Sequence, residues 1–495
     1  MSFDLLDAFS LGLSAAWQGQ YMLLLLVGCL IGLVVGALPG LGPASAMALL
    51  LPFTVHVSPL GALMLMAAIY YGAQYSGAAT AIWTNVPGES SAAMTCHDGH
   101  PMALSGRGHR AQWFALGASF VAGSLGVVVL ALASPLLVVW SYHFGPVEYV
   151  ALLVVGLLGA AVLASGGMVR ALAMVLLGML FGLSGTDGHT GDTRFVSSWP
   201  QWRDGFGFGA LALGLLAVAP LITHLQQTVT VSTAPGDTDG GAWPRRADWL
   251  AVLPALWRGS SLGLVLGVFP GGGALLSSWV AYALERSVSA HAQPPMGHGQ
   301  PRGVVAPEAA SSAGAQTAFL PTLALGLPAN AVMAVVLGVL VLHRIEPGPQ
   351  LMGVHPELFW GLIVSMGLGN LLLLVLSVPL LKVWRPLLQL PHKHGLPALL
   401  LLVGMVLYAR EHGAWAVWTV AGFGLLGHLL HRLRCEPSLL VLGFVLGPWI
   451  EAHLRRALLL ARGDWSVFLT RPVSAALLGV AVLLLLVVLL PRRKG

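Results

Sequence analysis

The sequence predicts an all-α polytopic membrane protein of about 11–13 transmembrane helices, some broken or re-entrant, in two pseudo-repeated halves. Hydrophobic residues make up 57% of the chain and charged residues only 9%, whereas a soluble domain carries about 25% charged residues. Many apolar runs reach the length of about 17–25 residues that crosses a bilayer. Glycine and proline interrupt several of these runs at corresponding places in the two halves, as in transporters built from repeats.

The apolar runs give the expected order of the helices. Runs long enough to cross the membrane lie near 20–38, 58–83, 112–140, 146–165, 168–184, 206–223, 253–283, 329–343, 357–381, 395–409, 413–431 and 472–490. Three further apolar pieces, near 43–55, 308–327 and 438–450, are too short or too interrupted to span. The first two adjoin the breaks, which suits re-entrant segments. The polar stretches 85–111, 185–205 and 224–249 are expected to be loops.

The breaks indicate an internal duplication. GALPGLGPAS (36–45) corresponds to GVFPGGGALL (267–276), and TNVPGES (84–90) corresponds to GLPAN (326–330). The paired prolines are 231 residues apart in the first case and 241 in the second, so both breaks recur at nearly one offset. We therefore expect a first transmembrane repeat at 1–223, a polar linker at 224–249, and a second repeat with the C-terminal helices at 250–495.

The breaks also predict a binding site for an anion. Proline removes a backbone donor, and inside lipid a break is tolerated only where the freed backbone groups face protein or a watery cavity. One such break commonly reflects helix packing, but four at matched offsets favour a site. A helix N-terminus offers unpaired amides and about half a positive charge, and the apolar runs contain almost no Lys or Arg. The predicted substrate-binding residues are Pro39, Gly40, Ser76, Asn85, Pro87, Gly88, Pro270, Gly271, Ser311, Ser312, Pro328 and Asn330.

Three acidic residues near the breaks are candidates for cation coupling. An acid at membrane depth is costly and usually serves a cation or a proton, so Glu308, Glu89 and Asp98 are assigned to a coupling ion, either Na+ or H+. The alternative for Glu89 and Asp98 is a solvated loop, because the Asp-Gly pair at 98–99 is typical of a turn.

Other classes of function lack support in the sequence. There is no phosphate-binding loop and no histidine or cysteine spacing typical of a metal site, so we expect no metal and no cofactor. The net charge of +5 comes from scattered arginines rather than a basic stripe, which argues against nucleic acid as a partner. No Lys or Arg precedes Arg107, and the chain ends in PRRKG, so the positive-inside rule places the C-terminus in the cytoplasm.

Two rival functions remain open. GLSG (182–185) has the form of an intramembrane serine protease nucleophile, with Ser184 attacking and His189 or His224 as base. The alternative is that Ser184 has only a structural role, as a residue at the end of a helix. The second rival is an uncoupled anion channel, which would conduct without a delivery protein.

Several long motifs together resemble one known family. They are GALPGLGPASAMALLLPFT (36–54), YYGAQYSGAATAIWTNVPGES (70–90), HDGHPMALSGRG (97–108), GVFPGGGALLSSWVAYALE (267–285), GVVAPEAASSAGAQTAFLPTLALGLPAN (303–330), EPGPQLM (346–352) and LGPWIEAHLRRALLLARGDWSVFLTRP (446–472). In this order they resemble the large membrane subunit of the bacterial tripartite tricarboxylate transporters. The resemblance extends over nearly the whole chain.

The resemblance implies a secondary carboxylate importer of the bacterial cytoplasmic membrane. It implies two partners, a small membrane subunit of about four helices and an extracytoplasmic solute-binding protein, and uptake driven by a cation gradient. The family motifs carry over onto Asn85, Pro87, Gly88, Glu89, Asp98, Gly99, Pro307, Glu308, Pro328 and the turns Pro39-Gly40 and Pro270-Gly271.

The chain departs from the family pattern at three places in the predicted site. It has Ser76-Gly77-Ala78 where the family usually has Gly-Gly-Ser, Ser311-Ser312 where the family has Asn-Asn, and Pro328-Ala329 where the family has Pro-Gly. The substrate expected is therefore a di- or tricarboxylate, not citrate in particular.

Overall fold

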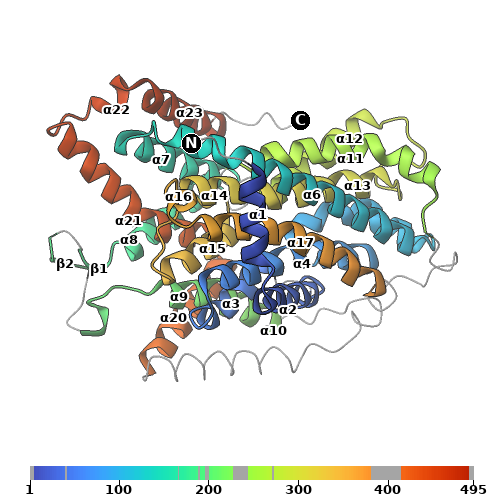
Figure 1. Ribbon diagram of the computed structural model, residues 1–495, viewed down its shortest axis with the longest axis horizontal. Helices are drawn as coiled ribbons and strands as arrows, with labels where there is room; N and C mark the ends of the chain where they lie inside the picture. The colour runs from blue at the N-terminus through green and yellow to red at the C-terminus, as the bar shows by residue number, and fades with distance from the viewer. Residues whose placement is uncertain are drawn as a thin grey trace.

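The protein is a bundle of helices, here described from a computed structural model (Figure 1). The structure describes residues 5–38, 42–164, 167–187, 190–195, 200–226, 243–269, 273–380 and 414–489. Within these residues the strands β1 (Gly185–Thr186) and β2 (Thr193–Arg194) form one short antiparallel pair. Five of the described helices, α2, α6, α11, α17 and α21, are long and apolar enough to cross a membrane. The predicted all-α polytopic membrane fold is confirmed.

The helices of the first half are α1 (Leu5–Ala16), α2 (Gly19–Gly36), α3 (Pro43–Thr54), α4 (Pro59–Thr84), η1 (Ser90–Ala92), α5 (Ala93–Leu104), α6 (Gly108–Ser141), α7 (Pro146–Val162), α8 (Met168–Gly182), η2 (Pro200–Trp202), α9 (Phe208–Ala212), η3 (Leu213–Val218) and α10 (Ala219–Gln226). Those of the second half are α11 (Arg246–Leu266), α12 (Gly273–Val288), α13 (Arg302–Thr317), α14 (Phe319–Leu325), α15 (Ala331–Leu342), α16 (Leu351–Val354), α17 (Pro356–Leu380), α20 (Ala414–Arg432), α21 (Pro437–Leu460), α22 (Val467–Thr470) and α23 (Pro472–Leu489).

Two helices, α4 and α13, form the centre of the bundle. Every residue of α4 from Leu60 to Thr84 is buried, and so is every residue of α13 from Gly303 to Thr317. In Figure 1, α21 and α22 lie at one end of the long axis and α11 and α12 toward the other. The outer helices carry the exposed leucines, valines and tryptophans that face lipid in such a protein.

Each central helix packs against a glycine-lined partner in the same way. In the first half, α2 places Gly28, Gly32 and Gly36 against the main-chain oxygens of Leu65, Ile69 and Ala73 in α4. In the second half, α11 places Gly259, Gly263 and Gly267 against the main-chain oxygens of Ala306, Ala310 and Gly314 in α13. Small residues allow this close approach of two backbones within a membrane. The glycines recur 231 residues apart and their partners 241 residues apart.

Hydrogen bonds and turns repeat at the same offsets. The Ser76 hydroxyl lies 3.1 Å from the Gly72 carbonyl oxygen and 3.4 Å from that of Gly32. Its counterpart Thr317 lies 3.1 Å from the Ala313 oxygen and 3.3 Å from the Gly263 oxygen.

The turns that end the two central segments also match. Asn85 ends α4 at φ 58°, ψ 19°, and Gly326 ends α14 at φ 73°, ψ 17°. The two offsets found in the sequence therefore describe one supersecondary unit that occurs twice.

Some expected boundaries were wrong. The stretch 85–111, predicted as a loop, contains α5 at Ala93–Leu104, because its polar side chains are satisfied inside the protein. The piece 438–450, predicted as too short or too interrupted to span, belongs to the longer α21, which continues through the polar stretch 451–456 to Leu460. The run 253–283 is two helices, α11 and α12. The predicted span 395–409 and most of the linker 224–249 lie outside the described residues, as do Pro39, Gly40, Pro270 and Gly271.

Candidate functional site

A cavity of about 650 Å³ lies where the breaks of the two halves meet. This volume falls in the range of small-molecule sites, roughly 300–1,000 Å³. The first half contributes Gly42, Pro43, Ala44, Tyr70, Pro87, Gly88, Glu89 and Ser90, and the second contributes Ala274, Leu275, Ala329, Asn330, Ala331 and Val332. A third wall comes from α7 and α21, with Ala160, Leu163, Ala164, Glu436, Ser438, Leu439 and Leu442.

Three helices begin at this cavity. Pro43, Gly273 and Ala331 are the first residues of α3, α12 and α15, and residues of each opening turn line the cavity. The free amides of a helix N-terminus amount to about half a positive charge. The described lining contains no Lys, Arg or His. Among the described lining residues, the groups that can attract an anion are therefore the main-chain dipoles of these helix starts, which suit a carboxylate.

Asn330 joins two of these helix ends. Its Oδ1 accepts a hydrogen bond of 3.0 Å from the Met333 amide and so caps α15. Its Nδ2 faces the start of α12, where a side chain at Gly273 would approach it to 2.8 Å. The Tyr70 hydroxyl lies beside Asn330 and Gln74. The amide of Asn330 is thus fixed in orientation at the cavity wall.

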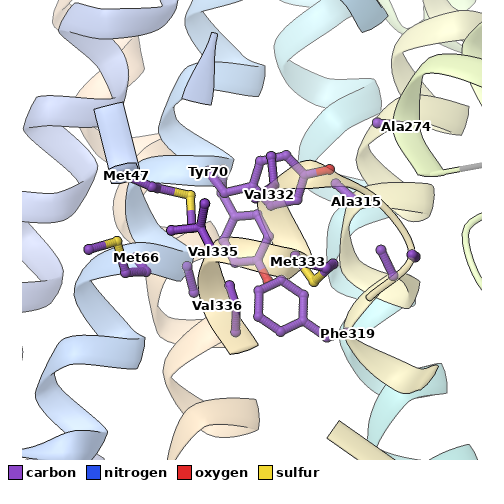
Figure 2. Close-up of a cluster of buried hydrophobic side chains, with 14 of the residues drawn as sticks. Met47, Met66, Tyr70, Ala274, Ala315, Phe319, Val332, Met333, Val335 and Val336 are labelled. Carbon is purple, nitrogen blue, oxygen red and sulfur yellow. The ribbon is translucent and has the colours of Figure 1, made fainter. Parts of the chain in front are cut away.

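The cavity-lining residues Tyr70 and Val332 are also part of the apolar core. Figure 2 shows Val332, Val335 and Val336 of α15 packed among Met47, Met66 and Tyr70. All of these residues are buried. A close-packed interior of this kind has low compressibility, so it holds the starts of α3 and α15 in place.

Of the three predicted coupling acids, Glu89 is the one that lines the cavity. It is 8% exposed, and its Oε1 accepts a hydrogen bond of 3.0 Å from Gln74 Nε2. The Gln74 oxygen in turn accepts one of 3.0 Å from the Ser91 hydroxyl. Oε2 of Glu89 is buried and has no hydrogen-bond partner among the described residues.

Glu308 lies deeper and outside the cavity lining. It is 2% exposed, and its Oε1 accepts a hydrogen bond from the Thr95 hydroxyl of α5. It acts electrostatically on Glu89. The structure therefore brings two of the three predicted coupling acids together, one at the cavity wall and one behind it.

Asp98 is held by main-chain amides away from the cavity. Its Oδ1 accepts hydrogen bonds from the amides of Gly297, Gly299 and Gln300 at 2.9, 3.1 and 2.8 Å. Its Oδ2 accepts one of 2.9 Å from the Tyr282 hydroxyl. These contacts fix the loop before α13 onto α5, and the coupling role of Asp98 stays a prediction.

The other predicted substrate-binding residues that the structure describes are not among the residues that line the cavity. Ser76 lies between α2 and α4, the Ser311 hydroxyl donates to the Glu308 main-chain oxygen at 3.1 Å, and the Ser312 hydroxyl is buried with no partner among the described residues. Asn85 is exposed and Pro328 is buried. Of the predicted substrate-binding residues, the lining includes Pro87, Gly88 and Asn330. Sequence reasoning missed Tyr70 and the α7 and α21 wall, which no local motif marks.

A family model for the tripartite tricarboxylate transporter TctA family matches residues 22–442. The chain belongs to this TctA family. It is 41% identical over 494 residues to an uncharacterised 52.8 kDa protein in the TAR-I ttuC' 3' region of Agrobacterium vitis, covering 99% of this chain and 97% of that one. It is 44% identical over 229 residues to an uncharacterised protein in the TAR-II ttuC' 3' region of the same organism, covering 46% and 94%. No solved structure matches.

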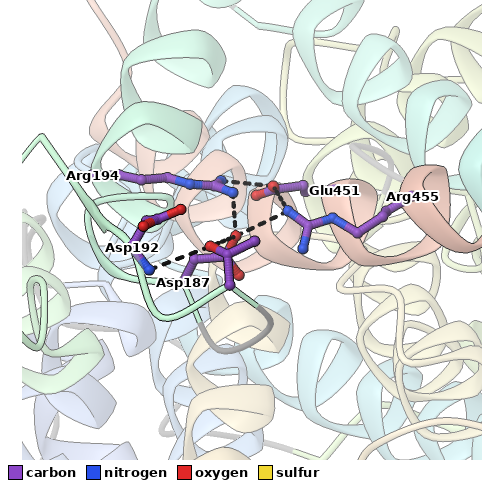
Figure 3. A network of polar contacts seen from close by, with 6 residues as sticks. Asp187, Asp192, Arg194, Glu451 and Arg455 are labelled. Atoms are coloured by element: carbon purple, nitrogen blue, oxygen red, sulfur yellow. Dashed lines mark hydrogen bonds and ion pairs between the residues drawn. The ribbon is translucent and has the colours of Figure 1, made fainter.

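The chain belongs to a transporter family, which favours transport over the alternative of a serine protease with Ser184 as its nucleophile. The Ser184 hydroxyl donates to the Phe181 main-chain oxygen at 2.6 Å, in the turn that ends α8. Beside it, Figure 3 shows an ion-pair network in which Arg194 and Arg455 bind Asp187 and Glu451. His189 and the side chain of His224 lie outside the described residues. The hydroxyl thus has the contact of a helix-end residue.

Proposed function

We propose that this TctA-family protein is the membrane permease of a binding-protein-dependent tripartite system. In this proposal it takes up di- or tricarboxylates across the bacterial cytoplasmic membrane by secondary, cation-coupled transport. It is multi-pass, with its C-terminus in the cytoplasm, and it is not an enzyme. Its partners are a small four-helix membrane subunit and an extracytoplasmic solute-binding protein.

One observation carries the proposal: the breaks of both repeats line one cavity that three helix N-termini face and no described basic side chain enters. Main-chain dipoles can attract a carboxylate and release it again, because they lack the full charge of an arginine. A site at the junction of two repeats is the usual arrangement in secondary transporters.

The proposed mechanism is alternating access. The binding protein releases a carboxylate at the outer side, and Asn330, Pro87, Gly88 and the neighbouring amides capture it. Glu308, Glu89 and Asp98 are the candidates for the coupling cation, Na+ or H+. The helices that carry the breaks then move relative to α7 and α21, so that the cavity opens to the other side.

The test is uptake of radiolabelled carboxylates by liposomes that contain the permease with its small subunit. We expect accumulation against a gradient only when the binding protein is outside and an ion gradient is imposed. A channel would instead equilibrate its substrate without the binding protein. The proposal is refuted if citrate, succinate and malate all fail to accumulate under both a Na+ and a pH gradient.

A further inference from the structure

The geometry points to a proton as the coupling ion, carried by Glu89 on the carboxylate oxygen that has no partner among the described residues. This inference rests on the proposed function and deepens it, since it names the ion and the group. The proton forms an O–H bond with Oε2 of Glu89 from water on the entry side. It returns to water on the other side when the substrate leaves.

The position of Glu89 meets the first requirement, contact with the substrate cavity. Glu89 lines the cavity and is 8% exposed. Its Oε1 is engaged by the Gln74 amide, and its Oε2 is buried without a partner among the described residues. A buried carboxylate oxygen without a donor is costly when ionised, but a protonated one becomes a donor itself. A substrate carboxylate in the cavity is an acceptor for that hydrogen.

The internal repeat provides the second argument. At the offset of 241 residues, Glu89 corresponds to Asn330, and both side chains line the same cavity. Asn330 is neutral and caps α15, whereas Glu89 can be ionised or neutral. This pair of positions is therefore equivalent in the repeat but differs in a titratable carboxyl group.

The charges that face Glu89 favour its neutral form when an anion is bound. Glu308 of α13 acts on it electrostatically, and Tyr70 of α4 and Glu436, the residue before α21, line the same cavity. The residues of α12 that line the cavity, Ala274 and Leu275, carry no charge. Glu285, further along α12, forms an ion pair with Arg258. From α5, Asp98 is held by the loop before α13.

A dicarboxylate adds two negative charges, and three helix N-termini supply only about one and a half positive ones. A proton on Glu89 removes one of the negative charges that oppose substrate binding.

The surroundings of Glu89 suit a proton better than a metal cation. A bound hard cation takes several oxygen ligands. The amide that meets Glu89 presents its N–H group, because the Gln74 oxygen is already occupied by the Ser91 hydroxyl.

The experiment uses liposomes with the full system and whichever of citrate, succinate or malate the wild type takes up. An inside-alkaline gradient of one pH unit is a tenfold proton ratio and can support about a tenfold accumulation per coupled proton. We expect this accumulation without Na+. Glu89→Gln, a permanently neutral mimic, should lose the accumulation but retain exchange of labelled for unlabelled substrate, with little dependence on pH. The matched control Glu357→Gln, at an exposed carboxylate, should behave as wild type.

The outcomes separate this inference from the proposed function. Accumulation by the wild type that needs a Na+ gradient and ignores the pH gradient would overturn the inference and leave the transport function standing. So would pH-driven accumulation that persists in Glu89→Gln. If Glu89→Gln is poorly folded, the comparison of wild-type uptake under the Na+ gradient and under the pH gradient still tests whether the coupling ion is a proton. A wild type that transports none of the three carboxylates would refute the transport function itself.

Discussion

The repeated glycine contacts lead to a prediction for Gly32→Ala and its repeat counterpart Gly263→Ala. A Cβ at position 32 would lie 2.5 Å from the Ile69 main-chain oxygen, and one at position 263 would lie 2.3 Å from that of Ala310. Ordinary contact begins at 3.4 Å, so each helix pair must separate by about 0.9–1.1 Å, since neither obstacle is a movable side-chain end.

The expected cost follows from two opposing terms. Overpacking of this kind typically lowers the free energy of unfolding by about 1–3 kcal/mol. Replacing glycine by alanine inside a helix raises it by up to about 1 kcal/mol. Because the clash is with backbone, we take the upper part of the range and expect a net loss of about 1–2 kcal/mol in the free energy of unfolding. Because the entropy of unfolding grows with chain length, each kcal/mol shifts the midpoint of a 495-residue chain by about 1 °C, and the midpoint should fall by about 1–2 °C.

The assay is thermal unfolding of the purified protein in detergent, followed by tryptophan fluorescence at one fixed scan rate, since such proteins often unfold irreversibly. The control is Gly422→Ala in α20, where the added Cβ would meet no atom within 4 Å. It should leave the midpoint unchanged or raise it. Midpoints for Gly32→Ala and Gly263→Ala as high as that of Gly422→Ala would refute the packing argument. A fall in only one of them would refute the energetic equivalence of the repeats.

Three further predictions concern single side chains. Asn330→Ala should raise the apparent KM for carboxylate uptake by about tenfold or more, the value of a hydrogen bond to a charged group; an unchanged KM would exclude Asn330 from the binding site. Asp98→Asn should lower the thermal midpoint, because an amide cannot accept all the hydrogen bonds from the loop before α13, at a cost of about 1–3 kcal/mol. Ser184→Ala should leave uptake at the wild-type rate, and a variant that instead loses cleavage of a membrane substrate would favour the protease.

The architecture of the repeat could be predicted from the sequence because proline and glycine mark it. The offsets of 231 and 241 residues, measured between prolines, also relate Gly32 to Gly263 and Ser76 to Thr317 in the structure. A broken membrane helix needs its freed backbone groups satisfied, so few residue types serve at such places. This is why the positions of Pro87, Gly88 and Asn330 at the cavity followed from local pattern.

The rest of the site depends on tertiary contacts that leave no local pattern. The third wall comes from α7 and α21, whose cavity residues are mostly alanine and leucine, as in any membrane helix. The stretch 85–111 resembled a loop because it is polar. However, Ser91, Thr95 and Asp98 lie on one inward side of η1 and α5 and are satisfied by Gln74, Glu308 and the loop before α13. Polarity alone cannot distinguish a buried network from a solvated loop.

Ser76 illustrates how repeat symmetry separates packing roles from binding roles. Its counterpart Thr317 makes the same contacts with the neighbouring glycine helix, so both hydroxyls serve helix packing in their own repeat. Glu89 and Asn330 differ from such pairs, because they occupy equivalent places but make different contacts. At this pair of positions only one repeat carries a carboxyl group that can take up a proton. The position where the repeats diverge in charge at the shared cavity is therefore where coupling should be sought first.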